Sequence, residues 1–270
     1  MCLLLEDMGF FIEASHHEAA PGQHEIDFRY DGALATADNV STFKLVVQTV
    51  AKKHGLHATF MPKPVAGSHG TCMHLNMSLF KDGANIFFDE NDPLKLSQEA
   101  YHYMGGLTKY AREFAAITNA SVNSYKRLIP GYEAPTDVCW GAGDRSPLIR
   151  VPAKRGTGTR VELRNPDPTA NHYLALSAVL AAGLDGIKSK IDPPDCCDQS
   201  TYDLDNKTKI SRGIQQFPRS LKEALQELKN STLMKDALGT HIFNMYIQAK
   251  TREWEEYSQE VHDWEFRRYL

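Results

Sequence analysis

Apolar residues recur at the three-and-four spacing of an amphipathic helix in several parts of the chain. Gly55 is a suitable stop for the first of these stretches, and the second contains Gly105 and Gly106, which weaken a helix interior. The third is rich in Ala and Leu and follows Asp167-Pro168, which suits a helix start. The predicted helices cover residues 42–54, 96–118 and 169–187, then the leucine-rich stretch from 220, followed by a longer helix through Trp254.

Three segments alternate instead between polar and apolar residues, which is the period of a strand. They are residues 24–30, 73–80 and 159–164. Each places an apolar row on one face and a polar row on the other. The polar rows are Glu25, Asp27 and Arg29, then His74, Asn76 and Ser78, then Arg160, Glu162 and Arg164. A half-solvated sheet gives the same pattern, but three rows rich in His, Glu and Arg favour a lined site.

The stretch HHEAAPGQHEID, residues 16–27, predicts a hairpin centred on Pro21-Gly22. In a symmetric register Glu18 lies directly opposite Glu25, and like charges in that position are destabilising. A bound cation between the two carboxylates removes the conflict, so the pattern suggests a metal site. Because Pro-Gly suits a type II turn, the register can slip by one residue. A solvated hairpin tip without metal is the competing interpretation.

A second concentration of charge lies between Lys126 and Arg164, in a region rich in Gly and Pro. Arg presents a planar fork of donors that fits carboxylate and phosphate groups. Together with metal-binding carboxylates, these arginines suggest a nucleotide or another anionic substrate. A basic face paired with nearby acids is the alternative. The arginines are Arg127, Arg145, Arg150, Arg155, Arg160 and Arg164.

The composition narrows the possible binding partners and the location of the protein, but it does not indicate a function. The chain has 270 residues and a net charge of -4, which gives no general reason to expect binding to nucleic acid or to an anionic membrane. The longest apolar run, Tyr173 to Leu184, is too short to span a bilayer. Five cysteines without zinc-type spacing favour a reducing, cytoplasmic location, and the N-terminus does not resemble a signal peptide.

No Walker-type phosphate loop, HExxH pattern or G-x-S-x-G elbow is present. The residues by themselves therefore indicate a metal-dependent enzyme that acts on a phosphorylated or anionic substrate. Phosphoryl transfer and metal-assisted hydrolysis both remain open.

Several long motifs narrow this choice, because in their order they resemble the catalytic domain of bacterial type I glutamine synthetases over nearly the whole chain. The family fold is α+β, a curved antiparallel sheet with one polar active-site face that is packed by helices. The family uses ATP to phosphorylate the side chain of glutamate, and ammonia then attacks the γ-glutamyl phosphate. The motifs are EASHHEAAPGQHEIDF, KHGLHATFMPKP, NSYKRLIPGYEAP, RSPLIRVPAKRG and VELRNPDPTANHYLALSAVLAAGLDGIK.

The resemblance implies roles for individual residues. Glu18 and Glu25 match ligands of one Mg²⁺ or Mn²⁺ ion, and His74 and Glu162 match ligands of a second. Glu133 matches a glutamate on a flap, where it shields the intermediate from water and helps to take a proton from ammonium. The remaining matches bind substrates: Arg127, Arg164 and Gly70 for glutamate, and Arg145, Arg150, Arg160 and Ser78 for the nucleotide and its phosphates.

The chain also departs from the family pattern. Its substrate loop reads His-Gly-Thr-Cys-Met-His at residues 69–74, where the family has Asn-Gly-Ser-Gly-Met-His. The family's N-terminal β-grasp domain and its Glu-x-Glu strand, which adds a ligand to each metal, are not in these 270 residues. We therefore expect residues 1–270 to be an N-terminally truncated catalytic domain with little activity alone. With the β-grasp domain, the resemblance implies a homo-oligomer, a dodecamer in the family.

Three further expectations follow from the resemblance. The amine acceptor is either ammonia or another amine, such as a polyamine or ethanolamine. A catalytically silent relative with a structural or regulatory role is a third possibility. Tyr202, in STYDLD, resembles a residue that is adenylylated in some family members, but an exposed tyrosine in the surface loop predicted for residues 193–206 explains it more simply.

Overall fold

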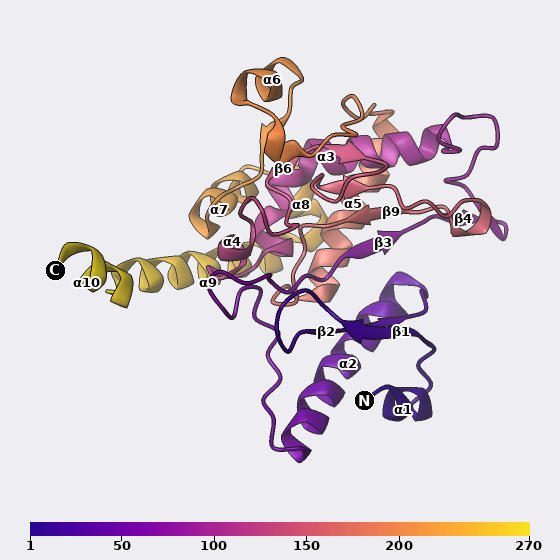
Figure 1. Cartoon of the computed structure of the whole chain (residues 1–270). Coiled ribbons are helices and arrows are strands. Elements are labelled where there is room, and N and C mark those ends of the chain that lie inside the picture. Colours follow the sequence, from indigo (N-terminus) through magenta and orange to yellow (C-terminus); the bar gives the residue numbers. More distant parts are fainter.

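The computed structural model describes residues 1–270 and contains ten α-helices, ten short strands and two 3-10 helices. This composition confirms the expected α+β class. Figure 1 shows the helices gathered around one small central sheet, with the first 60 residues below it. The helices are α1 (Cys2–Asp7), α2 (Ala33–Lys53), α3 (Gln98–Thr118), α4 (Ser124–Arg127), α5 (His172–Ser189), α6 (Asn206–Ser211), α7 (Leu221–Lys229), α8 (Thr232–Leu238), α9 (Thr240–Gln259) and α10 (Asp263–Tyr269).

The central sheet has four strands in the order β3-β9-β8-β7. β3 and β9 are antiparallel, as are β9 and β8, whereas β8 and β7 run parallel. The other strands form three separate two-stranded sheets, β1-β2, β4-β5 and β6-β10. The strands are β1 (Ile12–His17), β2 (His24–Phe28), β3 (Leu75–Met77), β4 (Phe80–Lys81), β5 (Ala84–Asn85), β6 (Asp137–Val138), β7 (Trp140–Gly141), β8 (Ile149–Arg150), β9 (Val161–Leu163) and β10 (Gln215–Gln216).

The core lies between the apolar face of this sheet and helices α3, α5, α7 and α8. It is one cluster of 32 buried residues that starts at Phe87 and ends at Phe243. Leu75 and Met77 of β3 pack against this cluster, as their alternation with His74 and Asn76 predicts. The sheet thus turns its apolar row to the helices and leaves the other face for polar side chains.

Helix α3 runs unbroken through Gly105 and Gly106, and its packing against α5 explains these glycines. A Cβ on Gly106 would lie 2.1 Å from the carbonyl oxygen of Ala182, and one on Gly186 would lie 2.2 Å from that of His102. Only glycine permits backbones to approach this closely. Gly105 and Gly106, which by themselves weaken a helix, therefore belong to the close packing of α3 against α5.

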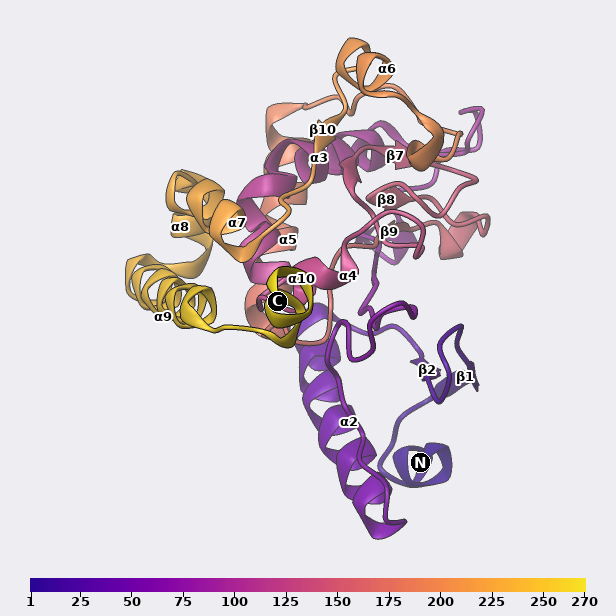
Figure 2. The same ribbon diagram turned by 60° about the vertical axis from the view of Figure 1, so that its left-hand side comes forward.

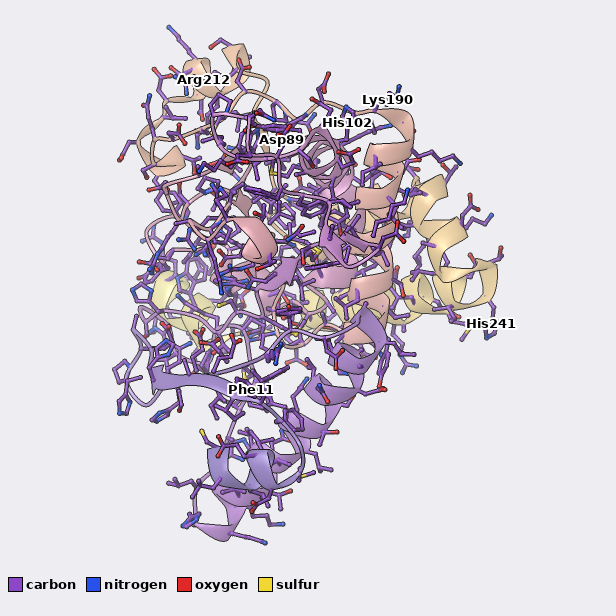
Figure 3. All side chains as sticks on the ribbon, turned by 90° about the vertical axis from the view of Figure 1, so that its right-hand side faces the viewer. Phe11, Asp89, His102, Lys190, Arg212 and His241 are labelled. Atoms are coloured by element: carbon purple, nitrogen blue, oxygen red, sulfur yellow. The ribbon has the colours of Figure 1, made fainter.

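Residues 1–60, which we call the N-terminal lobe, project from this core. Figure 2 shows α2 extending away from the sheet, with α1 and the β1-β2 hairpin beside it. In the side view of Figure 3, Phe11 of the lobe and Arg212, next to α6, lie toward opposite ends of the molecule. Only four hydrophobic side chains of the lobe are buried, Leu5, Ala37, Val46 and Ala51.

Several boundaries differ from the predictions. The helix expected at 42–54 starts nine residues earlier, at Ala33. The sequence did not reveal this start, because residues 33–41 mix alanines with polar residues and Gly32 offers no capping side chain. The helical stretch from 220 is three helices, α7 to α9, and Ser220 and Ser231 cap the first two. None of the helices is long and apolar enough to cross a membrane.

The loop predicted for residues 193–206 is only partly at the surface. It includes the 3-10 helix η2 (Thr201–Asp203), and Cys197 and Thr201 are buried. The second 3-10 helix, η1 (Gly156–Gly158), precedes β9. Burial of the loop follows from a hydrogen bond from the Cys197 amide to the Trp140 carbonyl at 2.8 Å, which draws it against β7.

Candidate active site

The β1-β2 hairpin carries the first cluster of candidate ligands. Its register pairs His16 with Glu25, so the prediction that Glu18 lies directly opposite Glu25 was wrong. Pro21 and Gly22 occupy the middle of a turn closed by a 3.0 Å bond from the Gln23 amide to the Ala20 carbonyl, and Gly22 has φ +71°. A type II turn requires that conformation at its third residue, and the resulting four-residue loop, Ala19 to Gly22, shifts the pairing by two residues, so that His16 takes the place expected for Glu18.

The shift leaves the same side chains on one face, because side chains alternate with a period of two. His16 Nε2 lies 3.2 Å from Glu18 Oε1 and 4.0 Å from Glu25 Oε2. One ligand atom from each of these three residues lies within 4.8 Å of the others. We call His16, Glu18 and Glu25 the hairpin cluster.

Crowding in the hairpin cluster shows in its protonation. Burial and the neighbouring carboxylates of Asp27 and Glu18 raise the pKa of Glu25 to about 8. Burial also acts to raise the pKa of Glu18, but the Ala19 amide, Glu25 and His16 outweigh it and lower that pKa. One proton is therefore held where two carboxylates meet, which is a position that a cation could take instead.

The polar face of the central sheet carries a second group, His74, Arg150, Glu162 and Arg164, which we call the sheet cluster. His74 Nδ1 lies 3.0 Å from Glu162 Oε1. Arg164 Nη1 lies 2.8 Å from the same oxygen, and Arg150 Nη1 lies 3.0 Å from Oε2. Strand pairing produces this arrangement, because Glu162 on β9 is paired with Asn76 on one side and Arg150 on the other.

Glu162 is ionised in these surroundings. Burial acts to raise its pKa, but the His74 ring and the guanidinium groups of Arg164 and Arg150 lower it to about 2. His74 Nε2 and Arg150 Nε are buried without hydrogen-bond partners. A ring nitrogen and a guanidinium N–H in that state point to groups that are supplied from outside the chain.

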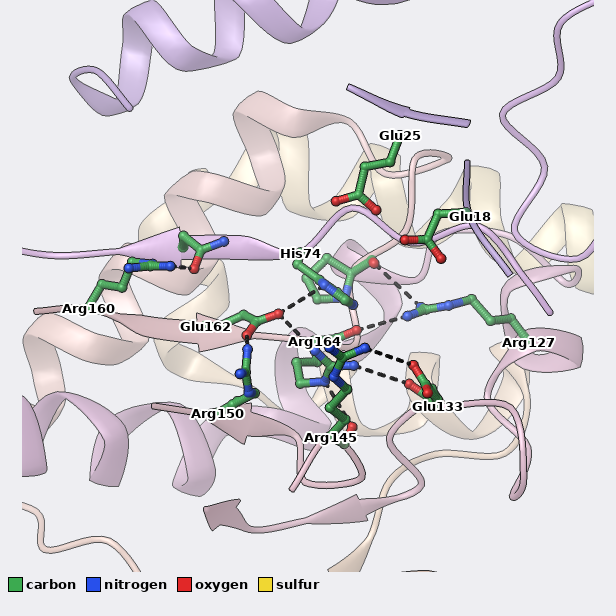
Figure 4. A network of polar contacts seen from close by, with 12 residues as sticks. Glu18, Glu25, His74, Arg127, Glu133, Arg145, Arg150, Arg160, Glu162 and Arg164 are labelled. Atoms are coloured by element: carbon green, nitrogen blue, oxygen red, sulfur yellow. Dashed lines mark hydrogen bonds and ion pairs between the residues drawn. The ribbon is translucent and has the colours of Figure 1, made fainter. Parts of the chain in front are cut away.

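Arg127 is held rigidly beside this cluster. Its guanidinium donates to the carbonyls of Asn165 at 2.7 Å and Arg164 at 2.9 Å, and it is 3% exposed. The Asn119 side chain fixes that segment by donating to the Asn165 carbonyl at 2.6 Å and to Asp167 Oδ2 at 3.0 Å. Figure 4 shows Arg127 reaching the segment from one side while Arg164 reaches Glu162 from the other.

The substrate loop packs directly on Arg127. A Cβ on Gly70 would lie 2.4 Å from the Pro62 carbonyl oxygen and 2.8 Å from Cγ of Arg127, so only glycine fits. Gln23 of the hairpin donates to the Gly70 carbonyl at 3.0 Å and lies 3.2 Å from the Thr71 hydroxyl. The hairpin cluster is thereby attached to the loop that leads into His74.

Residues 130–135, which we call the flap, contact the sheet cluster through Arg164. Arg145 Nη1 lies 3.5 Å from Glu133 Oε2, and both side chains are more than half exposed. Arg164 Nη2 donates to the Glu133 carbonyl at 3.4 Å and Arg164 Nε to the Arg145 carbonyl at 2.9 Å. Figure 4 shows Glu133 and Arg145 on the opposite side of Arg164 from Glu162, with Glu18 and Glu25 beyond His74.

Ten of the twelve candidate residues from the sequence therefore lie around Arg164 and His74, and two lie further along the sheet. Arg160 bonds to Asn76 Oδ1 at 2.9 Å, and Figure 4 shows it to one side of the group. Ser78 follows β3 and is half-buried. Arg155, a member of the basic stretch, is bound to the carbonyl of Leu94 at 2.6 Å and supports a loop.

Sequence reasoning missed three contributors. His16 shares the face of Glu18, a position that strand alternation alone could have identified. Gln23 and Asn119 act through the backbone carbonyls that they contact. No sequence pattern marks such contacts, because they join segments 46 to 48 residues apart.

Both clusters fit divalent cations. The hairpin cluster offers two carboxylates and one imidazole, which suit Mg²⁺ or Mn²⁺. The sheet cluster offers the Glu162 carboxylate and an imidazole with an unpartnered buried nitrogen. Each set is small for a six-coordinate ion, so water, substrate or further residues would have to complete it.

A cavity of about 500 Å³ elsewhere is a weaker candidate for a site. It lies beside α6 and includes Arg112 and Lys209. Arg112 is already paired with Glu223 and Glu227, and Lys209 lies 2.8 Å from Asp137 Oδ2. Both basic groups of this cavity thus have carboxylate partners of their own, whereas in the sheet cluster Arg150 and Arg164 share the single carboxylate of Glu162.

Comparison with known proteins adds to this geometry. A family model described as "Glutamine synthetase, catalytic domain" matches residues 1–269. A glutamine synthetase of Methanosarcina mazei is 57% identical over 98% of the chain, and one of Clostridium saccharobutylicum is 54% identical over the whole chain. The chain spans 60% and 61% of the length of these two relatives.

Solved structures show the same fold. A structure titled "GmaS/ADP complex-Conformation 1" matches the whole chain with a TM-score of 0.91 at 36% identity, and the match covers 62% of that structure. A second, titled "Apo GmaS without ligand", matches 98% of the chain with a TM-score of 0.88, also at 36% identity, and 60% of that structure is covered.

Proposed function

The chain belongs to the glutamine synthetase family as a catalytic domain, and from this premise we propose that it serves the ATP-dependent ligation of ammonia to the glutamate side chain. In the proposed reaction the γ-phosphoryl group passes from ATP to the glutamate carboxylate, and ammonia displaces phosphate from the γ-glutamyl phosphate. The products are glutamine, ADP and phosphate.

The observation that carries this proposal is the convergence of two groups of metal-ligand type on one set of arginines. In Figure 4 His74 lies between Arg164 and the two carboxylates of Glu18 and Glu25, and Glu162 contacts both His74 and Arg164. Phosphoryl transfer requires positioned cations around the phosphates and little covalent chemistry from the protein. Unpartnered nitrogens on His74 and Arg150 are the positions at which this chain could receive phosphate oxygens or an ion that binds them.

The glutamate substrate is assigned to the side of the site formed by Arg127, Arg164 and Gly70. Arg164 is 4% exposed and its guanidinium is ordered by Glu162 and two carbonyls, so it is preorganised for a carboxylate. Arg127 fixes the backbone beside it, and Gly70 allows the loop to lie against Arg127.

The nucleotide is assigned to the opposite side, along the sheet. Arg150 extends from β8, Arg160 precedes β9 and Ser78 follows β3, so all three lie along neighbouring strands. Arg145 lies between them and the flap. In this arrangement the arginines neutralise charge that develops on the transferred phosphoryl group.

Mg²⁺ or Mn²⁺, when bound, would neutralise substrate charge and hold the phosphates and the glutamate in register. Glu18 and Glu25, with His16, would hold one ion, and His74 and Glu162 the other. Glu133, whose side chain is 58% exposed on the flap, would accept a proton from ammonium and limit access of water to the acyl phosphate.

A double substitution tests the metal assignment. Glu18→Gln plus Glu25→Gln replaces both metal-binding carboxyl groups with amides of the same size, so Mn²⁺ affinity should fall by at least about tenfold, which is about 1.4 kcal/mol. Isothermal titration at constant pH measures the affinity. Glu6→Gln plus Glu13→Gln removes two exposed carboxylates from the same lobe outside the cluster and should bind as the unaltered chain does. Equal affinities in all three proteins would refute the hairpin site.

An assay of phosphate release from ATP tests the reaction. Release should require both glutamate and an amine, and ammonia should support it better than ethanolamine or a polyamine. Release without glutamate would indicate a hydrolase, and a preference for another amine would change the acceptor. The relatives named glutamine synthetase, at 54% to 57% identity, support ammonia as the acceptor.

A further inference from the structure

The flap contains an unusual backbone conformation at its central residue. Glu133 has φ +52°, in the left-handed region that side chains other than glycine rarely adopt. Gly131, two residues earlier, has φ +88°, but glycine adopts this region without steric strain because it has no Cβ. A strained residue of this kind persists only where its surroundings hold it, so the contacts that fix the flap have a functional meaning.

The first half of the flap is held by Tyr132. Its ring makes an edge contact with His69, with ring centroids 5.6 Å apart, and Lys63 Nζ lies 3.7 Å from the ring centre. At Glu133 the contacts are looser, a 3.4 Å bond from Arg164 to the carbonyl and a 3.5 Å ion pair with exposed Arg145. Neither of these two contacts is short enough to fix the backbone that follows Glu133.

The second half of the flap is held by a residue from a different part of the chain. The Tyr202 hydroxyl donates a hydrogen bond to the Ala134 carbonyl at 2.7 Å, and Ala134 is buried. Tyr202 is therefore half-buried and its hydroxyl is hydrogen-bonded, whereas the sequence suggested an exposed loop tyrosine. Burial raises the pKa of Tyr202 to about 12, so the hydroxyl keeps its proton at neutral pH.

Tyr202 is itself well anchored. The amide of the preceding residue, Thr201, donates to the Ser146 hydroxyl at 2.8 Å, and both residues are buried. The chain is fixed again at Cys197, whose amide bonds to Trp140 on β7. The phenol is thus presented to the flap from a segment that the central sheet supports.

We propose that Tyr202 is a positioning residue that latches the flap through the Ala134 carbonyl and so holds Glu133 over the site. The inference rests on the proposed function for its catalytic consequence, although the latch itself is a property of the unliganded chain. Without the hydroxyl the Glu133 side chain would leave the site more often, and water would reach the acyl phosphate.

The latch can be tested without any activity, by digestion of the folded chain with a glutamate-specific protease. Cleavage between Glu133 and buried Ala134 requires the flap to open. Tyr202→Phe removes only the hydroxyl and should raise this cleavage rate roughly fivefold, the factor expected for one ordinary hydrogen bond. Cleavage after Glu260, at the exposed end of α9, should not change and serves as the internal reference.

Tyr246→Phe is a matched control, because the Tyr246 hydroxyl also donates to an alanine carbonyl at 2.7 Å, but to that of Ala116 on α3 and not to the flap. It should leave cleavage after Glu133 at the rate of the unaltered chain. The latch is refuted if Tyr202→Phe does not accelerate cleavage after Glu133, if it accelerates cleavage after Glu260 equally, or if Tyr246→Phe has the same effect.

A second measurement links the latch to catalysis in protein that shows glutamate-dependent phosphate release. Tyr202→Phe should release more phosphate per amide formed than the unaltered chain, because a poorly covered intermediate is hydrolysed. An unchanged ratio would refute the catalytic part of the inference. Absence of glutamate-dependent release from the unaltered protein would count against the proposed function instead, and the protease result would still decide the latch.

Discussion

Gly70 connects substrate binding to packing more directly than any charged residue of the site. Its Cα faces the Pro62 carbonyl and the stem of Arg127, and the neighbouring Thr71 amide bonds to that same carbonyl at 2.8 Å. The loop cannot move outward easily, because Gln23 holds the Gly70 carbonyl from the other side. A methyl group at this position must therefore displace either the loop or Arg127.

Gly70→Ala should lower the free energy of unfolding by about 1–3 kcal/mol, the usual cost of overpacking. It should also raise the KM for glutamate about tenfold or more if the assignment of Arg127 is right, because a displacement near 1 Å is costly in a preorganised site. Urea unfolding measures the first effect. Initial-rate kinetics, in protein that shows glutamate-dependent phosphate release, measure the second.

Gly32→Ala is the control for this substitution. Gly32 has φ -54° and no atom within 4 Å of an added Cβ. Its substitution should therefore leave the free energy of unfolding within about 0.5 kcal/mol of the unaltered chain and should not change the KM for glutamate. Gly70→Ala with unchanged stability and KM would show that the loop yields without effect on Arg127.

Among single residues, the sequence identified the charged candidate ligands but not the buried side chains that hold them in place. Glu18 and Glu25 were identified as a pair from their spacing, although a type II turn moved the register by two residues. Asn119 and Asn165 are buried and hold Arg127 through carbonyl groups. Hydrophobic pattern gives no sign of buried amides, because their value depends on partners that only the fold brings near.

Among the elements, α3 and α7 are joined by a polar contact at the edge of the core. Arg112 of α3 lies 2.8 Å from Glu223 and 2.7 Å from Glu227, both on α7. Burial acts to raise the pKa of Glu223, but the Arg219 amide and Arg112 outweigh it and lower that pKa below its ordinary value of 4.5. Ionised Glu223 therefore stabilises the packed pair of helices.

This shift fixes the sign of a pH effect. A carboxyl group whose pKa is lowered by folding contributes stability above its unfolded pKa, and the contribution is lost as pH falls through the folded pKa. Glu223→Gln should thus lower the free energy of unfolding at pH 7 by no more than about 1 kcal/mol, because the pair is partly exposed. The difference from the unaltered chain should shrink toward zero as the pH falls below 4.5 and through the lowered pKa of folded Glu223.

Urea unfolding at several pH values measures that difference. Glu256→Gln provides the comparison, since Glu256 pairs with Arg252 on the open face of α9, where both side chains are more than 60% exposed. It should change stability little at any pH. A difference for Glu223→Gln that grows as pH falls would contradict the assignment.

Helices with strong periodicity were predicted well, and short strands were not. The spacing over 96–118 locates α3 within two residues, and Gly55, with φ +70°, ends α2 as predicted. β6, β7 and β8 have two residues each and are held by neighbouring segments rather than by their own pattern. Such strands exist because of the sheet that they join, so no local period reveals them.

At the scale of the whole molecule, the proposed metal site and the core belong to parts of unequal stability. α2 and α3 both have 21 residues, but α2 has three buried residues and α3 has twelve. The contacts that join the lobe to the rest are largely polar, such as Lys44 to the Pro168 carbonyl at 2.7 Å and Tyr173 to Asp38 at 2.7 Å. The N-terminal lobe should therefore open before the core does.

Native-state hydrogen exchange measures this order. Amides of α2 should exchange with an opening free energy roughly 2 kcal/mol or more below that of α3 and α5, since local openings range from near zero up to global unfolding. Equal values for the three helices would mean that the chain unfolds as one unit and that the lobe is as firmly attached as the core.

Metal binding should change this order selectively, because the hairpin cluster lies in the weaker part. At a free Mn²⁺ concentration ten times the Kd, a bound ion stabilises the states that hold it by about 1.4 kcal/mol. Amides of β1 and β2 should then exchange about tenfold more slowly, and amides of α3 should not change. Glu18→Gln plus Glu25→Gln should abolish the effect on β1 and β2. If Mn²⁺ slows exchange equally in that variant, the ion binds elsewhere, and the two carboxylates that face His74 do not form the metal site.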